Sequence, residues 1–392
     1  ICMGNYDTLQ KKLLASIVAN QAPDISQNYE SVTKKFARYG RIVCFDEFLA
    51  SESEDIKADI IPVLLANNTF DGKLWSFPFN KSVPVLYYNK ELFEKAGLDP
   101  EKPPQTWTEL ASFAARLTVR NAQGVTQVYG FGTGKANVWM YCCRVLQHGG
   151  QLMDKDFSRS LLSEPPAVQA LKMMQDMIRS GIAYEGQGFD PQNDFKAQRV
   201  AIIDQTIVSK VHMETGSGIS FKYGIAPLPG EATRAVILSG TNINIFNNGN
   251  TEKIKGAWAF IKWFTSTEVG AEWARDTTYM PVRKSSITHP ILQDKLAQDP
   301  NLRAPFEELE YSYFEPRIAC WFEIRDLMAD FLERATMRKP PSFLGHLKGL
   351  LSPSEKKGPT ETLSEFSALP DPESVLSQMS RDIDGILRHS AK

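Results

Sequence analysis

The sequence lacks both long apolar runs and an excess of charge of one sign. No apolar stretch in its 392 residues approaches the roughly 20 residues that a membrane-spanning helix needs. Its 44 basic and 46 acidic residues give a formal net charge of -2, which provides no long-range field for nucleic acid or for an anionic membrane surface. We therefore expect no nucleic-acid partner, and we expect any anionic ligand to be bound by local groups.

Motifs of catalysis and of metal binding are also missing. The five histidines are scattered, and none has a second ligand at metal-binding spacing: His148, His212, His289, His346 and His389. The glycines of 130–134 lack the Lys and Ser/Thr of a phosphate-binding P-loop, and no GxSxG motif occurs. Nothing selects one catalytic pair among the 46 acidic residues. We predict no metal site, no cofactor and no enzymatic activity.

The cysteines form no CxxC pair, and their odd number prevents all of them from being bridged. They are Cys2, Cys44, Cys142, Cys143 and Cys320. Because a thiol packs as a small apolar group, we predict buried structural cysteines.

Length and periodicity indicate two α/β lobes. A chain of 392 residues exceeds what one hydrophobic core usually supports. Apolar spacing predicts helices over 9–17, 90–96, 107–117, 166–180 and 252–264, and strands near 25, 83–88, 200–203, 223–226 and 236–245. This alternation is typical of α/β domains with parallel or mixed sheets. Residues 338–372, rich in Pro, Ser, Gly and Lys, predict an exposed insertion, followed by an amphipathic helix from about Glu373.

One stretch carries a family resemblance. Residues 74–107 read LWSFPFNKSVPVLYYNKELFEKAGLDPEKPPQTW, which resembles the signature of the family 1 extracellular solute-binding proteins. The segment PFNKSVPVLYYNK, followed by AGLDP, a proline pair and TW, is similar to the sn-glycerol-3-phosphate and glycerophosphodiester binding proteins of the Ugp importers. The resemblance covers about residues 4–335 and the final helix. It implies a periplasmic-binding-protein-like fold of type II, with two α/β lobes joined by a hinge.

The resemblance also implies a set of ligand-binding residues, each in a local motif. They are Tyr6 of GNY, Glu30 of YE, Ser82 of PFNxS, Thr206 where the family has serine, Gly240 of SGT, Tyr279 of TYMP and Arg325 of IR. Taken singly, the tyrosines have an alternative reading as core residues, Glu30 as a surface acid and Arg325 as an ion-pair partner. The joint match favours a binding site.

These residue types suit a phosphorylated glycerol unit. Arg325 can present a forked donor pair to phosphate, and the hydroxyls of Ser82 and Thr206 can donate to its oxygens. Backbone N–H groups near Gly240 can also approach the phosphate, because no Cβ blocks them. Glu30 can accept hydrogen bonds from glycerol hydroxyls, and Tyr6 and Tyr279 can cover the carbon skeleton.

Two further residues leave alternatives open. Trp139, in a pocket-lining region of the family, can offer an aromatic face to a quaternary ammonium group, which would favour glycerophosphocholine. Lys81 stands where the family often has a small residue. Its ammonium can point to solvent or assist phosphate binding, and the sequence does not decide between them.

The functional prediction is therefore a solute-binding component of an ABC importer. It would capture glycerophosphodiesters such as glycerophosphocholine, or sn-glycerol-3-phosphate, by hinge closure. The alternatives are an oligosaccharide-binding protein of the same family and a secreted phosphodiesterase. The expected partners are a phosphorylated polyol and the permease subunits. The protein is expected to be a monomer, and to be periplasmic or lipid-anchored.

The resemblance predicts how the lobes divide. Lobe 1 would comprise residues 1–88 and 240–281, and lobe 2 residues 89–239 and 282–392, with crossings near 88–90, 238–241 and 281–284. Family members normally have a strand and a long helix before the GNY motif, so lobe 1 is expected to lack them.

Overall fold

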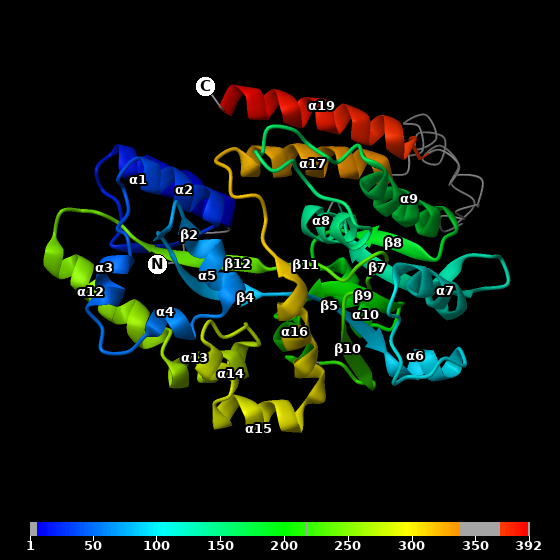
Figure 1. The fold of residues 1–392 in the computed structure, drawn as a ribbon. Helices are drawn as coiled ribbons and strands as arrows, with labels where there is room; N and C mark the ends of the chain where they lie inside the picture. Colours follow the sequence, from blue (N-terminus) through cyan, green and yellow to red (C-terminus); the bar gives the residue numbers. More distant parts are fainter. Residues whose placement is uncertain (1–5, 136, 217, 337–368, 391–392) are drawn as a thin grey trace, which may run out of the picture. The chain divides into compact units, whose positions relative to one another are not determined.

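The computed structural model describes residues 6–135, 137–216, 218–336 and 369–390, without the side chains of Tyr6 and Asp7. The predicted insertion therefore lies almost entirely outside the described residues. The chain packs into two compact units, each an assembly of helices and strands (Figure 1). Unit 1 comprises Ile1–Val83, Thr206–Val211 and Ile237–Phe322, and unit 2 comprises Pro84–Gln205, His212–Val236 and Glu323–Lys392.

Unit 1 contains a three-stranded antiparallel sheet in the order β1-β12-β4. These strands are β1 (Ile25–Asn28), β12 (Ser239–Ile245) and β4 (Phe77–Ser82). A two-stranded pair, β2 (Thr69–Phe70) with β3 (Lys73–Leu74), precedes β4. Polar and apolar residues alternate along β12, yet residues 241–245 are all buried, so this central strand is covered on both faces.

Helices accompany this sheet in unit 1. They are α1 (Tyr6–Val18), α2 (Glu30–Arg38), α3 (Asp46–Ala50), α4 (Ile56–Asp59), α5 (Pro62–Asn68), α12 (Thr251–Phe264), α13 (Thr267–Thr277), α14 (Lys284–Ile287), α15 (Pro290–Gln298) and α16 (Ala304–Glu307). Among them, α2 and α12 contact β12, and α5 contacts β4. The apolar stripe of α1 packs where its period predicts. Leu13 is buried with Phe36 and Phe246, and Leu9 and Ile17 lie against them.

Unit 2 is built on a six-stranded mixed sheet in the order β10-β5-β9-β7-β6, with β8 also paired to β7. Strand β7 runs parallel to β8 and β9, whereas β10 runs antiparallel to β5. The strands are β5 (Pro84–Asn89), β6 (Val119–Arg120), β7 (Thr126–Gly134), β8 (Ala183–Gly186), β9 (Val200–Thr206) and β10 (Tyr223–Pro227). All six residues of β5 are buried, as expected of a strand inside a sheet that is covered on both faces.

Helices border this sheet and close unit 2. They are α6 (Lys90–Lys95), α7 (Trp107–Leu117), α8 (Val138–Gln147), α9 (Pro165–Arg179), α10 (Asp190–Lys196) and α19 (Pro372–Ser390). Figure 1 shows α19 beside α9 and α17 (Trp321–Thr336). Helix α19 packs on α9, and its residues Leu376, Met379 and Ile383 are buried. The predicted final amphipathic helix is thus confirmed.

Most of the other predicted elements are confirmed as well. Thr106 caps α7 by accepting a hydrogen bond from the N–H of Glu109 at 3.0 Å, and the Glu109 carboxylate accepts one from the N–H of Gln105 at 2.7 Å. The predicted strand over 236–245 is divided into β11 (Val236–Ile237) and β12. No helix among the described residues is long and apolar enough to cross a membrane.

Three of the four described cysteines agree with the prediction. Cys142, Cys143 and Cys320 are buried thiols and Cys44 is half-buried, whereas Cys2 lies outside the described residues.

The unit boundaries fall after Val83, Gln205, Val211, Val236 and Phe322. The predicted crossings lie near 88–90, 238–241 and 281–284. Compact packing shows which residues share a core and does not test where a chain bends. The predicted hinge positions therefore stay predictions.

A buried ion pair lies in the core of unit 2. Arg144 of α8 and Asp204 of β9 are 2.5 Å apart, with side-chain exposures of 4% and 0%. Arg144 also lies over the ring of Trp107, whose indole N–H donates to Gln147 Oε1 at 2.7 Å. Burial raises the pKa of Asp204, and the charge of Arg144 opposes that rise.

We expect Arg144→Met to lower the free energy of unfolding by about 3–5 kcal/mol, because it leaves Asp204 as a buried charge without its cation. Urea denaturation at pH 7 measures this, and the double variant Arg144→Met/Asp204→Leu should recover much of the loss. A single variant as stable as the parent would contradict the expectation.

Candidate functional site

The predicted site residues of unit 1 are organised by the pairing of β4 with β12. Gly240 pairs with Lys81, and Ser239 pairs with Ser82. Gly240 has φ +95°, and a Cβ there would lie 1.8 Å from the carbonyl oxygen of Asn80. Only glycine fits this close approach. The conformation of the strand pair therefore explains the glycine without reference to a ligand.

Ser82 and Thr206 are joined directly. Their hydroxyl oxygens share a hydrogen bond, although the two residues are 124 positions apart in sequence. The backbone N–H of Ile207 donates to the carbonyl of Val83 at 3.0 Å, which ties the end of β9 to the end of β4. The two predicted hydroxyls thus lie side by side in unit 1.

Tyr279 lies at the other edge of β4. The N–H of the next residue, Met280, donates to the carbonyl of Lys81 at 2.7 Å. The Tyr279 ring stacks on Trp273, with centroids 6.2 Å apart and an interplanar angle of 12°. Its ring also borders a small apolar pocket lined in part by Ile207 and Phe306.

Glu30, the first residue of α2, is buried rather than on the surface. Asn242 Nδ2 of β12 donates to Glu30 Oε2 at 3.4 Å. Burial raises the pKa of the Glu30 carboxyl, while the charge of Lys81 and a hydrogen bond from the Asn67 side chain oppose the rise. The surface alternative for Glu30 is wrong.

Lys81 is buried too, with only 1% of its surface exposed. Of the two alternatives left open by the sequence, the one in which its ammonium points to solvent is therefore wrong. Burial lowers the pKa of Lys81 to about 8, and the Glu30 charge partly compensates. Lys81 and Glu30 thus form a buried pair of opposite charge beside the Gly240 pairing.

Several buried polar atoms around Glu30 have no partner within the described part of the chain. They include the side-chain oxygens of Asn28, Ser31, Asn67 and Asn242. Buried polar atoms normally have a hydrogen-bond partner, and a group of orphaned ones needs an explanation. Asn28 and Asn242 face each other across the β1–β12 pairing. We name these four residues, with Glu30, Lys81, Ser82 and Thr206, the unit 1 polar cluster.

The sequence reasoning missed the asparagines of this cluster. The signal was the strand TNINI, where Asn242 and Asn244 alternate with isoleucines and yet are fully buried. Asn244 Oδ1 accepts a hydrogen bond from Asn28 Nδ2 at 2.9 Å. An asparagine repeated on one face of a central strand predicts a buried polar network.

The other predicted residues fall elsewhere. Trp139, in the first turn of α8, and Arg325, on α17, belong to unit 2, and both are half-buried. Tyr6 begins α1, and its side chain lies outside the described residues. The remaining five predicted residues, Glu30, Ser82, Thr206, Gly240 and Tyr279, belong to unit 1.

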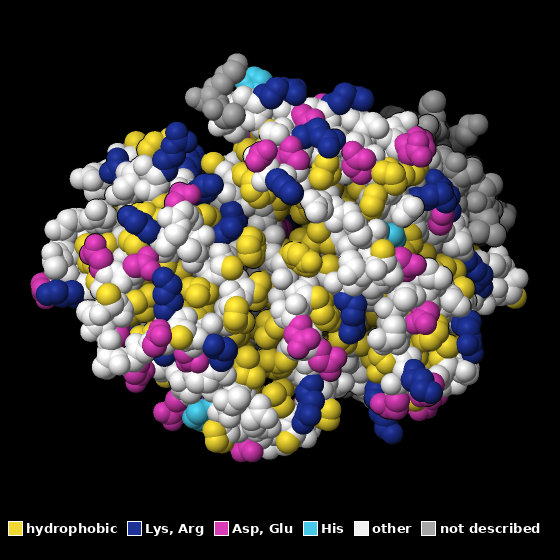
Figure 2. Space-filling view, in the orientation of Figure 1, with side chains coloured by type: hydrophobic (Ala, Val, Ile, Leu, Met, Phe, Trp, Pro, Cys, Tyr) yellow, Lys and Arg dark blue, Asp and Glu magenta, His cyan; other side chains and the backbone are white. Residues whose placement is uncertain are grey.

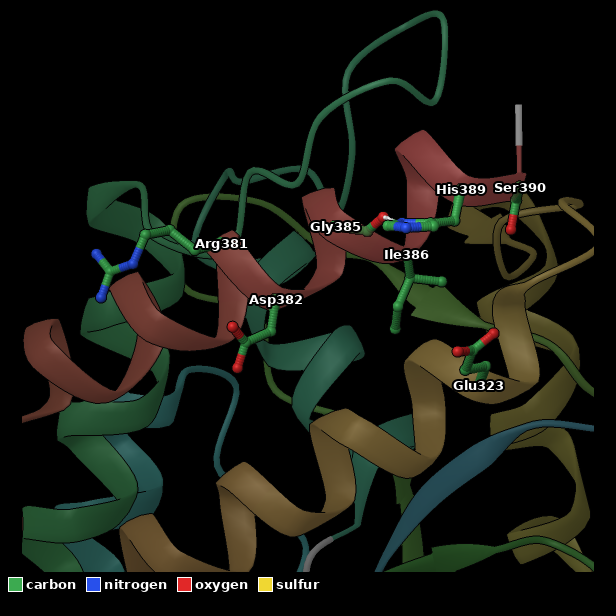
Figure 3. Close-up of a pocket in the computed structure, with 7 residues that line it drawn as sticks. All are labelled: Glu323, Arg381, Asp382, Gly385, Ile386, His389 and Ser390. Atoms are coloured by element: carbon green, nitrogen blue, oxygen red, sulfur yellow. Dashed lines mark hydrogen bonds between the residues drawn. The ribbon is translucent and has the colours of Figure 1, made fainter. Parts of the chain in front are cut away.

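A separate depression in unit 2 lies between α17 and α19 (Figure 3). The Glu323 carboxylate faces Ile386 and His389 across it, while Arg381 points away. Figure 2 shows basic and acidic side chains interspersed over these two helices. No predicted site residue lines the depression, and its charged residues Glu323 and Arg381 are exposed to solvent.

Comparison with known proteins identifies the family. The model of the bacterial extracellular solute-binding proteins matches residues 2–304. The chain belongs to this family. This solute-binding protein is 28% identical over 296 residues to the sn-glycerol-3-phosphate-binding periplasmic protein UgpB of Yersinia pestis. That match covers 71% of this chain and spans 65% of the length of the relative.

Solved structures share its fold. UgpB from Mycobacterium tuberculosis, in complex with glycerophosphocholine, has a TM-score of 0.81 at 22% identity, over 100% of this chain and 91% of that one. An ABC transporter solute-binding protein from Thermotoga lettingae, bound with α-D-tagatose, has a TM-score of 0.77 at 24% identity, over 97% and 90%. The predicted fold, two α/β lobes of the periplasmic-binding-protein kind, is confirmed.

Burial of the charged Lys81 lowers the free energy of unfolding by an amount that can be measured. Since the pKa of Lys81 falls from 10.5 to about 8 on folding, its charged form is destabilised in the native state at pH 7. As pH rises from about 8 to 10.5, the native protein has released this proton and the unfolded chain still holds it, so the cost falls.

We expect Lys81→Met to raise the free energy of unfolding at pH 7 by about 3 kcal/mol, from roughly 1.4 kcal/mol per pKa unit. The gain should shrink between pH 8 and 10.5. Urea denaturation across this pH range measures it, with Lys34→Met, an exposed lysine of α2, as control. A Lys81→Met variant less stable than the parent at pH 7 would refute this account.

Proposed function

We propose that this protein is the solute-binding component of an ABC importer and captures glycerophosphodiesters such as glycerophosphocholine, or sn-glycerol-3-phosphate. The observation that carries the proposal is the unit 1 polar cluster. Within unit 1 it combines a buried ammonium, a hydroxyl pair and orphaned amide oxygens.

The cluster contains both acceptors for the hydroxyl groups and donors for the phosphate oxygens of a phosphorylated polyol. Glu30 and the side-chain oxygens of Asn67 and Asn242 accept hydrogen bonds, and glycerol hydroxyls donate them. Lys81 and the hydroxyls of Ser82 and Thr206 can donate to phosphate oxygens. A ligand lacking either kind of group would leave buried polar atoms unpaired, which costs affinity.

Further parts of the proposal involve unit 2 and the rest of the transport system. Arg325 would bind the phosphate by its forked guanidinium, and Trp139 would offer its ring to a choline group. Tyr6 and Tyr279 would cover the carbon skeleton, and a backbone N–H near Gly240 would reach the phosphate. The protein would close on its ligand, deliver it to permease subunits as a monomer, and be periplasmic or lipid-anchored.

A second candidate ligand is a neutral sugar. It is favoured by the likeness to the Thermotoga lettingae protein, whose structure contains α-D-tagatose. A sugar would use the same acceptor groups for its hydroxyls, but it has no anion for Lys81. We therefore place phosphorylated polyols first.

The proposal is tested by isothermal titration calorimetry with glycerophosphocholine, glycerol-3-phosphate, maltose and tagatose. Saturable heat with either phosphorylated compound supports it, and binding confined to the sugars would replace it with the sugar alternative. Choline release from glycerophosphocholine on incubation with the protein would instead show a phosphodiesterase.

Arg325→Ala should weaken binding of the phosphorylated ligand by about 2 kcal/mol, because a bound anion loses a charged donor. The same titrations measure the loss, and Arg334→Ala, on the last turn of α17, is the control. Unchanged affinity would remove Arg325 from the site.

A further inference from the structure

Two cations in unit 1 act on the Glu30 carboxylate, and they differ in how their donors are used. Arg317 Nη1 donates to the backbone carbonyls of Ala66 and Thr69 at 2.7 and 2.8 Å. Its guanidinium also lies over the rings of Phe70 and Phe314. The contacts of Arg317 are thus made within the protein itself.

Lys81 is the opposite case. Its side chain is 1% exposed, yet within the described part of the chain its ammonium forms no hydrogen bond and no ion pair of contact distance. An ammonium has three donors, and burying them unpaired is strongly unfavourable. A lysine enclosed in this way, with no described hydrogen bond to its ammonium, has donors available for a ligand.

The backbone around Lys81 is held in place by its neighbours. Lys81 pairs with Gly240 on one side and with Met280 on the other, so its main chain is held from both edges of β4. The neighbouring Ser82 carries the hydroxyl that is joined to Thr206. The unused ammonium and the hydroxyl pair therefore belong to consecutive residues of one rigid strand.

Stability does not account for Lys81. A methionine has a similar apolar stem and no charge to desolvate, so it would fill the same space at lower cost. A residue that costs stability in a folded core is typical of a functional site.

We propose that Lys81 contacts the ligand and determines its specificity: its ammonium binds the anionic group of the solute and selects phosphate-bearing compounds over neutral polyols. This inference rests on the proposed function of the same site and adds the residue that distinguishes its two candidate ligand classes. Before the ligand binds, the Glu30 carboxylate would balance the charge of Lys81. The anionic group of the bound solute would then take over part of this role of Glu30 as counter-charge.

Two variants separate charge from shape. Lys81→Met removes charge and donors, and Lys81→Gln keeps a donor without the charge, with Lys34→Met as the exposed control. Each variant is titrated in the calorimeter with glycerophosphocholine, glycerol-3-phosphate, inorganic phosphate, maltose and tagatose. We expect both Lys81 variants to bind the phosphorylated ligands at least about tenfold more weakly, as for a lost charge-assisted hydrogen bond. Binding of a neutral solute should be unchanged or stronger.

The pH dependence of ligand affinity distinguishes a binding role of Lys81 from a structural one, because a structural lysine would not affect it. Neither the phosphodiester nor the quaternary ammonium of glycerophosphocholine titrates between pH 7 and 9.5. The pKa of Lys81 is about 8 in the ligand-free protein, so the lysine loses its charge over this range. The affinity of the protein for glycerophosphocholine should therefore fall about tenfold or more between pH 7 and 9.5. The slope should vanish in Lys81→Met.

The groups near Lys81 that also carry charge or titrate are Glu30 of α2, Glu315 and Arg317 after β13 (Ser312–Tyr313), and Tyr279 before Met280. They are present in parent and variant alike. The difference between the two pH profiles therefore reports the lysine.

The outcomes distinguish the inference from the proposed function. Tight binding of glycerophosphocholine that survives in both Lys81 variants would overturn the inference and leave the function standing. Full affinity in Lys81→Gln alone would also overturn it, because charge would then not be the cause. If inorganic phosphate binds and weakens in Lys81→Met while the glycerol compounds do not bind, the inference stands and the proposed function fails. Binding of neutral solutes only, or of none of the five, would overturn both.

Discussion

The close approach of β12 to β4 at Gly240 is the constraint on which unit 1 depends. Because the Gly240 Cα has no side chain, the carbonyl of Asn80 can occupy the space where a Cβ would lie. This contact fixes Lys81 and Ser82 on one strand, and it sets Asn242 of the other strand beside Glu30. The pairing of the backbone strands thus determines where the side chains of the polar cluster lie.

Apolar packing elsewhere in unit 1 offsets the cost of burying this polar cluster. Phe36, Phe246 and Leu13 form one core beside the sheet, and the aromatic rings of Phe45, Phe77 and Trp258 pack at 5.8 Å from one another. Unit 2 also buries charged groups in its core. Its buried Arg144 and Asp204 form an ion pair at 2.5 Å, whereas no contact partner of the Lys81 ammonium is described in unit 1. The contrast distinguishes an ion pair within a core from a cation whose donors we propose to serve a ligand.

The fold was largely predictable from the sequence, because its signals are local. Periodicity located α1, α9, α12 and α19, and the Thr106–Glu109 capping box located α7. The division of 236–245 into two strands was not predicted, since a break in strand pairing leaves no compositional trace. The site was predicted through motif resemblance, which named Glu30, Ser82 and Thr206. Resemblance could not show that Lys81 is buried, nor that Asn67 joins Glu30, because both depend on pairing between distant segments.

The segment Thr206–Val211 leaves unit 2, joins unit 1 and returns within six residues. Each unit is therefore made of three separate stretches of chain, and no single cut would release either one as a contiguous fragment. Neither can complete its core during synthesis until the chain has been made as far as Phe322, where unit 1 ends. Assembly must consequently be a late, concerted event, and a truncated product ending before that point would present the unfinished strands of both units to solvent.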